Sequence, residues 1–270
     1  MPTANSSSPS GGWRNFPDVY AKLGPPLRPS AGDVENFRRA TSSGEQRVLL
    51  LGVTPELSVL GRKLTAVDNS PRMLADVWPG DGEARRAMLA DWTDLPFEDG
   101  SFDAVIGDGS LNSAPEQVAA VLIEARRVLS PTGDAVFRLF CSPERPETLD
   151  GIAKDVAGSW KGNLHALKWR IAMALAASTP RAIVPVADIL DAFNGMFPDR
   201  HALEAQTGWP PEEIATLDAY AGADHSLGFP TLSAFEEALR RHFSGISVHF
   251  AADYPLAERC PTVLCRGTAA

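Results

Sequence analysis

Acidic residues stand just after short apolar runs at three points in the first half of the chain. Asp68, Asp91 and Asp108 each follow such a run closely. A carboxylate at the carboxyl end of a strand can accept hydrogen bonds from both hydroxyls of a ribose. This spacing therefore predicts a nucleotide-type site assembled from several strand ends.

The apolar run at 48–51 ends at Gly52, where the backbone can turn sharply and a ligand can approach closely. All four residues of the run are apolar, as in a parallel strand that is buried on both faces. Thr54 and Pro55 are typical of a helix N-cap and first turn, and such a helix would direct its free N–H groups at the strand end. The stretch 47–68 therefore predicts a strand, a turn, a helix and a second strand around a ligand.

Strand and helix patterns alternate along most of the chain. This alternation predicts right-handed crossovers and a doubly wound, mostly parallel α/β sheet of seven strands. A short, proline-containing connection joins the last two strands, which predicts an antiparallel last strand. The predicted strands cover residues 48–51, 64–67, 87–90, 102–106, 135–140, 246–250 and 262–265.

Several helices are expected to begin at a serine, since its hydroxyl can accept a hydrogen bond from a free N–H of the first turn. A turn at 131–133 is expected to separate a helix from the fifth strand. The predicted capping serines and their partners are Ser30 with Asp33, Ser70 with Pro71, Ser113 with Glu116, and Ser233 with Glu236.

The chain divides into parts of different composition. Residues 1–12 are polar and rich in glycine and serine, which predicts a disordered tail and not a signal peptide. Residues 13–46 are expected to form an N-terminal cap segment, and residues 47–141 with 231–270 the sheet domain. Residues 142–230 break the alternation and predict a helical insertion after the fifth strand. Helices inside this insertion are expected at 163–176 and near 186–193.

The net charge of −9 limits the classes of partner. Residues 143–230 hold 12 acidic and 7 basic residues, so the insertion is not expected to bind a nucleic-acid backbone. No apolar run approaches the ~20 residues needed to span a bilayer. Cys141, Cys260 and Cys265 lack CxxC spacing, which predicts reduced thiols. Together these features predict a soluble, cytoplasmic protein without a nucleic-acid or membrane partner.

Three longer stretches have a recurring order of residue types. Residues 90–112, ADWTDLPFEDGSFDAVIGDGSLN, combine an acidic residue, a Leu-Pro-Phe loop and a Gly-Ser-Phe-Asp turn before the fourth strand. Residues 64–74 contain the second strand and its acidic end, and residues 124–137 a helix, turn and strand. These stretches resemble the class I S-adenosylmethionine-dependent methyltransferases. The resemblance spans residues 47–140 and implies a Rossmann-like fold, S-adenosyl-L-methionine as cofactor, and methyl transfer.

The resemblance implies cofactor-binding roles for residues at the second and third strand ends. Asp68 would hold the ribose hydroxyls, and Asn69 would line the adenine side. Asp91 would accept a hydrogen bond from the adenine amino group, with Trp92 contributing a ring face or backbone N–H beside it.

Residues at the first and fourth strand ends would contact the rest of the cofactor. Gly52 and Val53 would pass close to the methionine part, and Asp108 or Gly109 would lie near its amino-acid end. Asp103, inside the Ser-Phe-Asp turn, is interpreted as structural.

The first loop departs from the family pattern, in which an acidic residue precedes three spaced glycines. Here Leu50 stands in place of the acidic residue, and Gly52 is the one glycine retained. Val53 and Pro55 add bulk near the ligand. Glu56 or another residue is expected to recover the lost carboxylate contact.

The insertion at 142–230 is expected to cover the cofactor and to shape the pocket for a small-molecule acceptor, although it could instead form a homodimer surface. Tyr20, His165, Trp169 and His225 are the candidate acceptor contacts. For each of these rings, packing inside a helical cap is the simpler interpretation. No catalytic residue is assigned from the sequence.

Two other functions remain open at this stage. A non-catalytic module that binds S-adenosylmethionine or a nucleoside would explain the degenerate first loop. An oxidoreductase is a weaker alternative, since it depends more heavily on the GxGxxG pattern that is missing here. The insertion has no metal-ligand spacing, so a metal is not expected.

Overall fold

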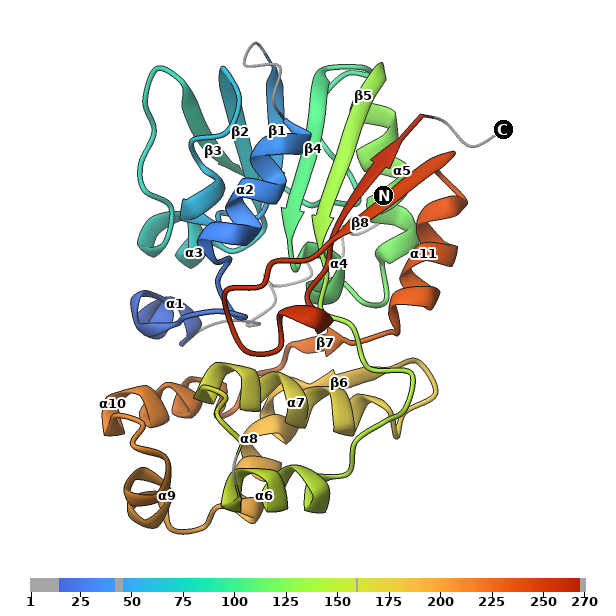
Figure 1. Cartoon of the computed structure of the whole chain (residues 1–270). Helices are drawn as coiled ribbons and strands as arrows, with labels where there is room; N and C mark the ends of the chain where they lie inside the picture. The colour runs from blue at the N-terminus through green and yellow to red at the C-terminus, as the bar shows by residue number, and fades with distance from the viewer. Residues whose placement is uncertain (1–14, 42–45, 159, 268–270) are drawn as a thin grey trace, which may run out of the picture.

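The computed structural model describes residues 15–41, 46–158 and 160–267 (Figure 1). Its main sheet has the strand order β3-β2-β1-β4-β5-β9-β8. Strands β1 to β5 are parallel, whereas β9 is antiparallel to both β5 and β8. This topology confirms the predicted seven-stranded α/β sheet with an antiparallel last strand. The strands are β1 (Arg47–Leu51), β2 (Lys63–Asp68), β3 (Arg85–Leu89), β4 (Phe102–Asp108), β5 (Leu129–Arg138), β8 (Gly245–His249) and β9 (Thr262–Arg266).

Helices cover both faces of the sheet: α2 (Ala31–Ala40) on one face, and α5 (Val118–Val128) with α11 (Leu232–Arg240) on the other (Figure 1). Side chains of a strand alternate between the two faces. Val48 and Leu50 accordingly lie in the core cluster on the α2 side, while Leu49 and Leu51 lie in the cluster on the α5 and α11 side. This double burial explains the continuous apolar run of β1.

The predicted helix at Thr54 is wrong in length and capping. The structure has only a single 3₁₀ turn, η2 (Pro55–Leu57), and Thr54 makes no side-chain capping bond. Leu57 and Leu60 are buried beside the sheet, and the chain must reach β2 at Lys63. The segment between the two strands is therefore too short for a longer helix.

The second strand is followed by α3 (Pro71–Asp76), as predicted. The Ser70 hydroxyl caps this helix by accepting from the Met73 N–H at 3.3 Å. Ser30 and Asp33 form the expected reciprocal capping box at α2, with bonds of 3.1 and 3.0 Å.

Two other caps were predicted wrongly. Ser113 ends the short helix α4 (Ser110–Ser113) and donates its backbone N–H to the Gly109 carbonyl, so it lacks the extended backbone of an N-cap. Thr231 and not Ser233 caps α11, since Ser233 already lies within the helix. The predicted turn at 131–133 is also wrong, because β5 starts immediately after α5 and is irregular there.

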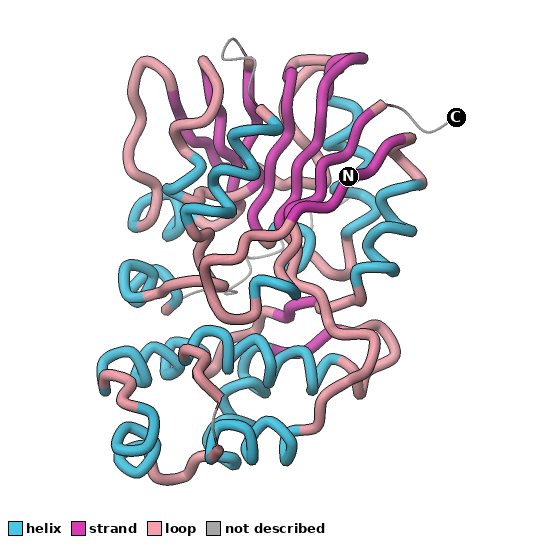
Figure 2. Tube along the Cα trace, in the orientation of Figure 1, coloured by secondary structure: helices cyan, strands magenta, loops and turns pink. Residues whose placement is uncertain are grey.

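Residues 142–230 form a mainly helical part below the carboxyl ends of the strands (Figures 1 and 2). The predicted helices near 163–176 and 186–193 are present. A small two-stranded sheet, which the sequence did not predict, joins them. The elements are α6 (Leu149–Ala157), α7 (Leu164–Ala176), β6 (Ile183–Pro185), α8 (Val186–Met196), α9 (Arg200–Thr207), α10 (Pro211–Ile214), η3 (Ala215–Tyr220) and β7 (Ser226–Gly228).

A short N-terminal segment lies between the sheet and this helical part (Figure 1). It contains α1 (Phe16–Val19) and η1 (Tyr20–Lys22). The predicted disordered tail at 1–12 lies outside the described residues. Among the helices that the structure describes, none has the length and apolar character required to cross a bilayer. Cys141, Cys260 and Cys265 are buried free thiols.

Candidate functional site

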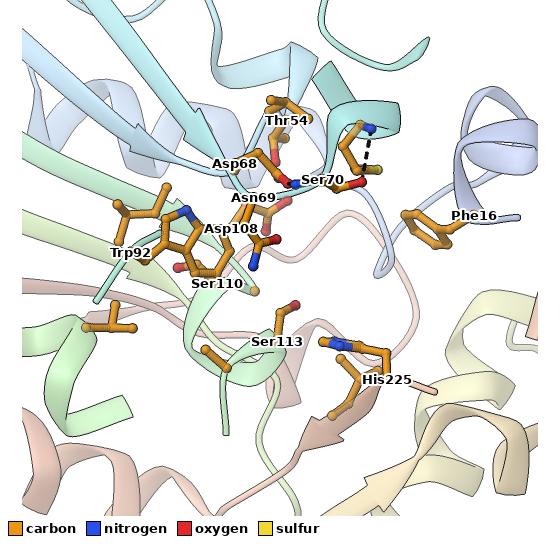
Figure 3. A pocket seen from close by; sticks show the side chains of 18 of the residues that line it. Phe16, Thr54, Asp68, Asn69, Ser70, Trp92, Asp108, Ser110, Ser113 and His225 are labelled. Atoms are coloured by element: carbon orange, nitrogen blue, oxygen red, sulfur yellow. Dashed lines mark hydrogen bonds between the residues drawn. The ribbon is translucent and has the colours of Figure 1, made fainter. Parts of the chain in front are cut away.

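A cavity of about 300 Å³ opens at the carboxyl ends of β1, β2 and β4 (Figure 3). Ligands of open α/β sheets bind at this edge. Every residue predicted at a strand end lines this one cavity, although the residues come from four separate stretches of the chain. They are Gly52, Val53, Asp68, Asn69, Asp91, Trp92, Asp108 and Gly109.

Gly52 turns the chain at the end of β1. Its φ of +108° is a conformation that residues with a side chain rarely adopt. Its N–H donates to the Val67 carbonyl at 2.8 Å, and the Trp92 indole N–H donates to the same carbonyl at 2.7 Å. The Val67 carbonyl of β2 therefore holds both the first loop and the Trp92 ring at the cavity.

Asp68 is a buried carboxylate at the end of β2, only 8% exposed. Its Oδ1 accepts a hydrogen bond from the Ser70 N–H at 2.8 Å. Burial raises the pKa of this carboxyl to about 6, and the bond from Ser70 opposes the shift. Asp68 thus lines the cavity with one oxygen held by the backbone.

Asp91 lies in the loop after β3 and is exposed. Its Oδ1 accepts from both the N–H and the hydroxyl of Thr93, each at 2.8 Å. These two bonds hold the carboxylate beside Trp92 at the cavity edge.

Asp108 belongs to a buried charge network. Its Oδ1 accepts from Arg138 Nε at 2.5 Å. The same guanidinium donates to Asp33 at 3.1 Å and to the Pro26 carbonyl at 2.9 Å. Burial raises the pKa of Asp108, while Arg138 opposes that shift. The sequence patterns contained no signal for this network.

The first loop places no acidic side chain in the cavity. Leu50 is fully buried, and the Val53 side chain, 1% exposed, packs in the same core cluster. Glu56 does not line the cavity and forms an ion pair with Arg28 at 2.6 Å. Asp108 lines the cavity from the end of β4, the strand that pairs with β1.

Three of the four acceptor candidates line the cavity on the side away from the sheet: Tyr20, Trp169 and His225. His165 does not. Its Nε2 lies 3.6 Å from Glu213, and burial lowers its pKa to about 3. The His165 ring of α7 lies beside Gly24 of the N-terminal segment.

Further residues that line the cavity were not predicted from the sequence. Ser110, Ser113 and Gln117 line the cavity from α4 and the start of α5. The glycine-rich sequence at 107–110 is a local signal for Ser110. Residues on the far side have no such signal, because tertiary packing alone brings them to the sheet edge; they are Phe16, Leu27, Phe140 and Leu227.

Residues 52–137 match the family model described as a methyltransferase domain. The match includes all eight residues predicted to contact the cofactor. The chain contains a class I S-adenosylmethionine-dependent methyltransferase domain. The methyltransferase thus has S-adenosylmethionine as its methyl donor, the cofactor of this family.

Solved structures share the fold of this methyltransferase. A 1,6-didemethyltoxoflavin-N1-methyltransferase from Burkholderia thailandensis, with bound S-adenosylhomocysteine, is 17% identical over 95% of this chain and 84% of that chain, with a TM-score of 0.52. An S-adenosylmethionine-dependent methyltransferase from Mesorhizobium loti is 17% identical over 88% and 98%, with a TM-score of 0.50.

A Rhodobacter sphaeroides protein described as a Zn-dependent alcohol dehydrogenase is 14% identical over 93% of this chain and 98% of that chain, with a TM-score of 0.54. At these identities the likenesses show the fold alone. No curated protein matches the sequence of the methyltransferase.

Proposed function

We propose that the methyltransferase binds S-adenosylmethionine across the ends of β1, β2 and β4 and methylates a small molecule held beneath residues 142–230. One observation carries this proposal: a single cavity is lined by all eight predicted cofactor contacts and by three predicted acceptor contacts. The cofactor and acceptor would therefore share one enclosed space, as a direct transfer requires.

The chemistry of the strand ends fits the adenosyl part of the cofactor. The Asp68 carboxylate would accept the ribose hydroxyls through the oxygen not bound to Ser70. Asn69 and Asp91 would contact the adenine, and the Trp92 ring, fixed by its bond to Val67, would pack beside it.

The other end fits the methionine part. Gly52 allows the first loop to pass close to the ligand, and Asp108 would receive the positively charged amino group. Arg138 would position Asp108, because the guanidinium holds one of its two oxygens. This arrangement would replace the acidic residue lost at Leu50.

When bound, S-adenosylmethionine would supply a sulfonium methyl group for direct displacement by an acceptor atom, with S-adenosylhomocysteine as the leaving group. The protein's task is to align the acceptor and exclude water. Phe140, Trp169 and Leu227 provide an apolar wall for this purpose. A general base is needed only for an acceptor that enters protonated.

A small acceptor is supported by the size of the cavity, about 300 Å³ in total. The acidic composition of the chain disfavours a nucleic-acid acceptor. The similar Burkholderia thailandensis protein is named for a small-molecule acceptor, which is consistent with this proposal.

Replacing Asp68 tests the cofactor site. Asp68→Ala is expected to weaken S-adenosylhomocysteine binding by roughly 10²–10⁴-fold, since two hydrogen bonds to a charged group contribute about 1.5–3 kcal/mol each. Isothermal titration calorimetry measures this change. Asp103→Ala is the matched control, because Asp103 pairs with Arg47 and does not line the cavity. Unchanged affinity in Asp68→Ala would show that the site is assigned wrongly.

A further inference from the structure

The side of the cavity away from the sheet has an unusual composition. The residues that line it come from the N-terminal segment, from the chain after β5 and from residues 142–230. They include four aromatic side chains, and none is Lys, Arg, Asp or Glu. We call this surface the lid wall and define it by Phe16, Tyr20, Phe140, Trp169, His225 and Leu227.

The aromatic residues of the lid wall form two pairs. Phe16 and Tyr20 pack edge to face with ring centroids 5.8 Å apart. Phe140 and Trp169 pack at 5.2 Å, and Trp169 also contacts Phe229 at 5.3 Å. Trp169 is only 4% exposed, so its ring is held firmly. Rigid aromatic walls favour flat aromatic ligands, which stack on them or meet them edge to face.

Two arginines lie behind these pairs and do not line the cavity. The Arg28 guanidinium lies 4.9 Å from the Tyr20 ring centroid, and that of Arg138 lies 5.0 Å from Phe140. Arg28 is paired with Glu56, and Arg138 with Asp33 and Asp108. Neither cation is therefore available to balance a charged acceptor.

His225 is the most polar group of the lid wall. Figure 3 shows its ring pointing into the cavity, with Ser113 facing it from α4. Burial lowers the pKa of His225 to about 4, although Asp224 opposes the shift. The imidazole is therefore neutral at pH 7. A neutral imidazole has one nitrogen that donates a hydrogen bond and one that accepts, so the ring can pair with a polar group of the methyl acceptor.

The Trp169 indole Nε1–H has no hydrogen-bond partner among the described residues, but this nitrogen is itself buried, so a ligand in the cavity does not reach it. Trp169 therefore contributes an apolar ring surface to the lid wall. The lid wall thus offers a polar contact at His225 but no charge.

We propose that the methyl acceptor is an uncharged, flat aromatic molecule that binds between the Phe16–Tyr20 and Phe140–Trp169 pairs, with a polar group directed at His225. This inference rests on the proposed function. A charged acceptor would lose its hydration without gaining a partner at the lid wall. A cationic acceptor would also be repelled by the sulfonium of the bound cofactor.

A set of four probes of similar size tests the inference in the intact protein saturated with S-adenosylhomocysteine. The probes are 2-naphthol, 6-hydroxy-2-naphthoic acid, 2-naphthylmethylamine and decahydro-2-naphthol, with Kd measured by ligand-observed NMR. The neutral aromatic probe is expected to bind about tenfold or more tightly than the anion, the cation or the saturated alcohol, a difference that desolvation and ring packing can supply. Equal or tighter binding of any of the other three, or no binding of 2-naphthol, would overturn the inference.

Variants locate the binding. Phe16→Leu is expected to weaken 2-naphthol binding about fivefold to tenfold, in line with the loss of one aromatic contact. Trp169→Leu should do the same if circular dichroism shows it folded. Trp209→Leu is the matched control, because Trp209 pairs with Trp160 away from the cavity. If Trp209→Leu matters as much as Phe16→Leu, the probe binds elsewhere and the inference fails.

The cofactor titration is a separate result. If S-adenosylhomocysteine does not bind at all, the proposed function fails. If it binds normally but the order of the probes is reversed, only the inference about the acceptor fails.

Discussion

Asp68 is a buried carboxylate that lines the cavity at the end of β2. Its pKa is raised to about 6 because the carboxylate loses water in the cavity wall. In the unfolded chain the ordinary pKa of 3.8 applies, so the folded state binds more protons between about pH 4 and 6. The contribution of Asp68 to stability therefore falls as pH rises through that window. Ribose hydroxyls that donate to the ionised form would offset this cost.

Cofactor affinity should depend on pH through this group. S-adenosylhomocysteine binding is expected to be nearly constant above pH 7 and to weaken about tenfold between pH 7 and pH 5, as Asp68 takes up its proton. Calorimetry in a series of buffers measures the profile.

Asp68→Asn is the control for the pH profile. It should bind more weakly than the parent at pH 7 and show a flatter profile, since any remaining slope comes from other groups such as Asp108. A parent profile as flat as that of Asp68→Asn would contradict the assignment.

Among the elements, α4 joins the sheet to the helical part. Asn112 of α4 is fully buried, and its Nδ2 donates to the carbonyls of Phe140 at 2.8 Å and Gly228 at 2.6 Å. Its Oδ1 accepts from the Phe140 N–H at 3.0 Å. One side chain thus holds the ends of β5 and β7 together and sets the position of the lid wall.

Removing the Asn112 hydrogen bonds should destabilise the fold. Asn112→Ala is expected to lower the free energy of unfolding by roughly 2–4 kcal/mol, since it leaves buried carbonyl and N–H groups without partners. Urea denaturation followed by fluorescence measures the change. Asn194→Ala, at an exposed position, is the control and should change stability by less than about 0.5 kcal/mol. Similar values for the two variants would refute the role given to Asn112.

At the scale of the whole molecule, Arg138 links parts of the chain that are distant in sequence. Its guanidinium is fully buried and contacts Pro26, Asp33, Asp108 and the Tyr254 hydroxyl. These contacts join the N-terminal segment, α2, the end of β4 and the loop before β9. Arg138 therefore connects the end of the cavity at Asp108 to the N-terminal segment and to the loop before β9.

Removing one partner of a buried ion pair lowers the free energy of unfolding more than replacing both partners with apolar residues, because the remaining charge stays buried. Arg138→Met is expected to lower the free energy of unfolding by about 3–5 kcal/mol, because it leaves two buried carboxylates without their cation. Arg138→Met combined with Asp108→Asn should lose less than the sum of the single changes. Denaturant titration compares these variants with Arg47→Met, an exposed control that should cost little. Full additivity would contradict the coupling.

The sequence by itself determined the sheet and the side of the cavity that the strand ends form. Apolar runs with a period of two or continuous burial mark the strands, and parallel strands must bring their carboxyl ends to one edge. For that reason Gly52, Asp68, Asp91 and Asp108 could be placed together before the structure was known. The patterns that predict these strand ends lie within short stretches of neighbouring residues.

Tertiary structure alone decided the lid wall and the two buried connections. Arg138 and Asp33 are 105 positions apart, and Asn112 and Gly228 are 116 apart. No local period relates such residues, and their pairing depends on how the helical part docks on the sheet. The same docking placed His225 in the cavity and His165 outside it, although the two rings look equivalent in sequence. Contacts set by chain-wide packing leave no short-range pattern from which to predict them.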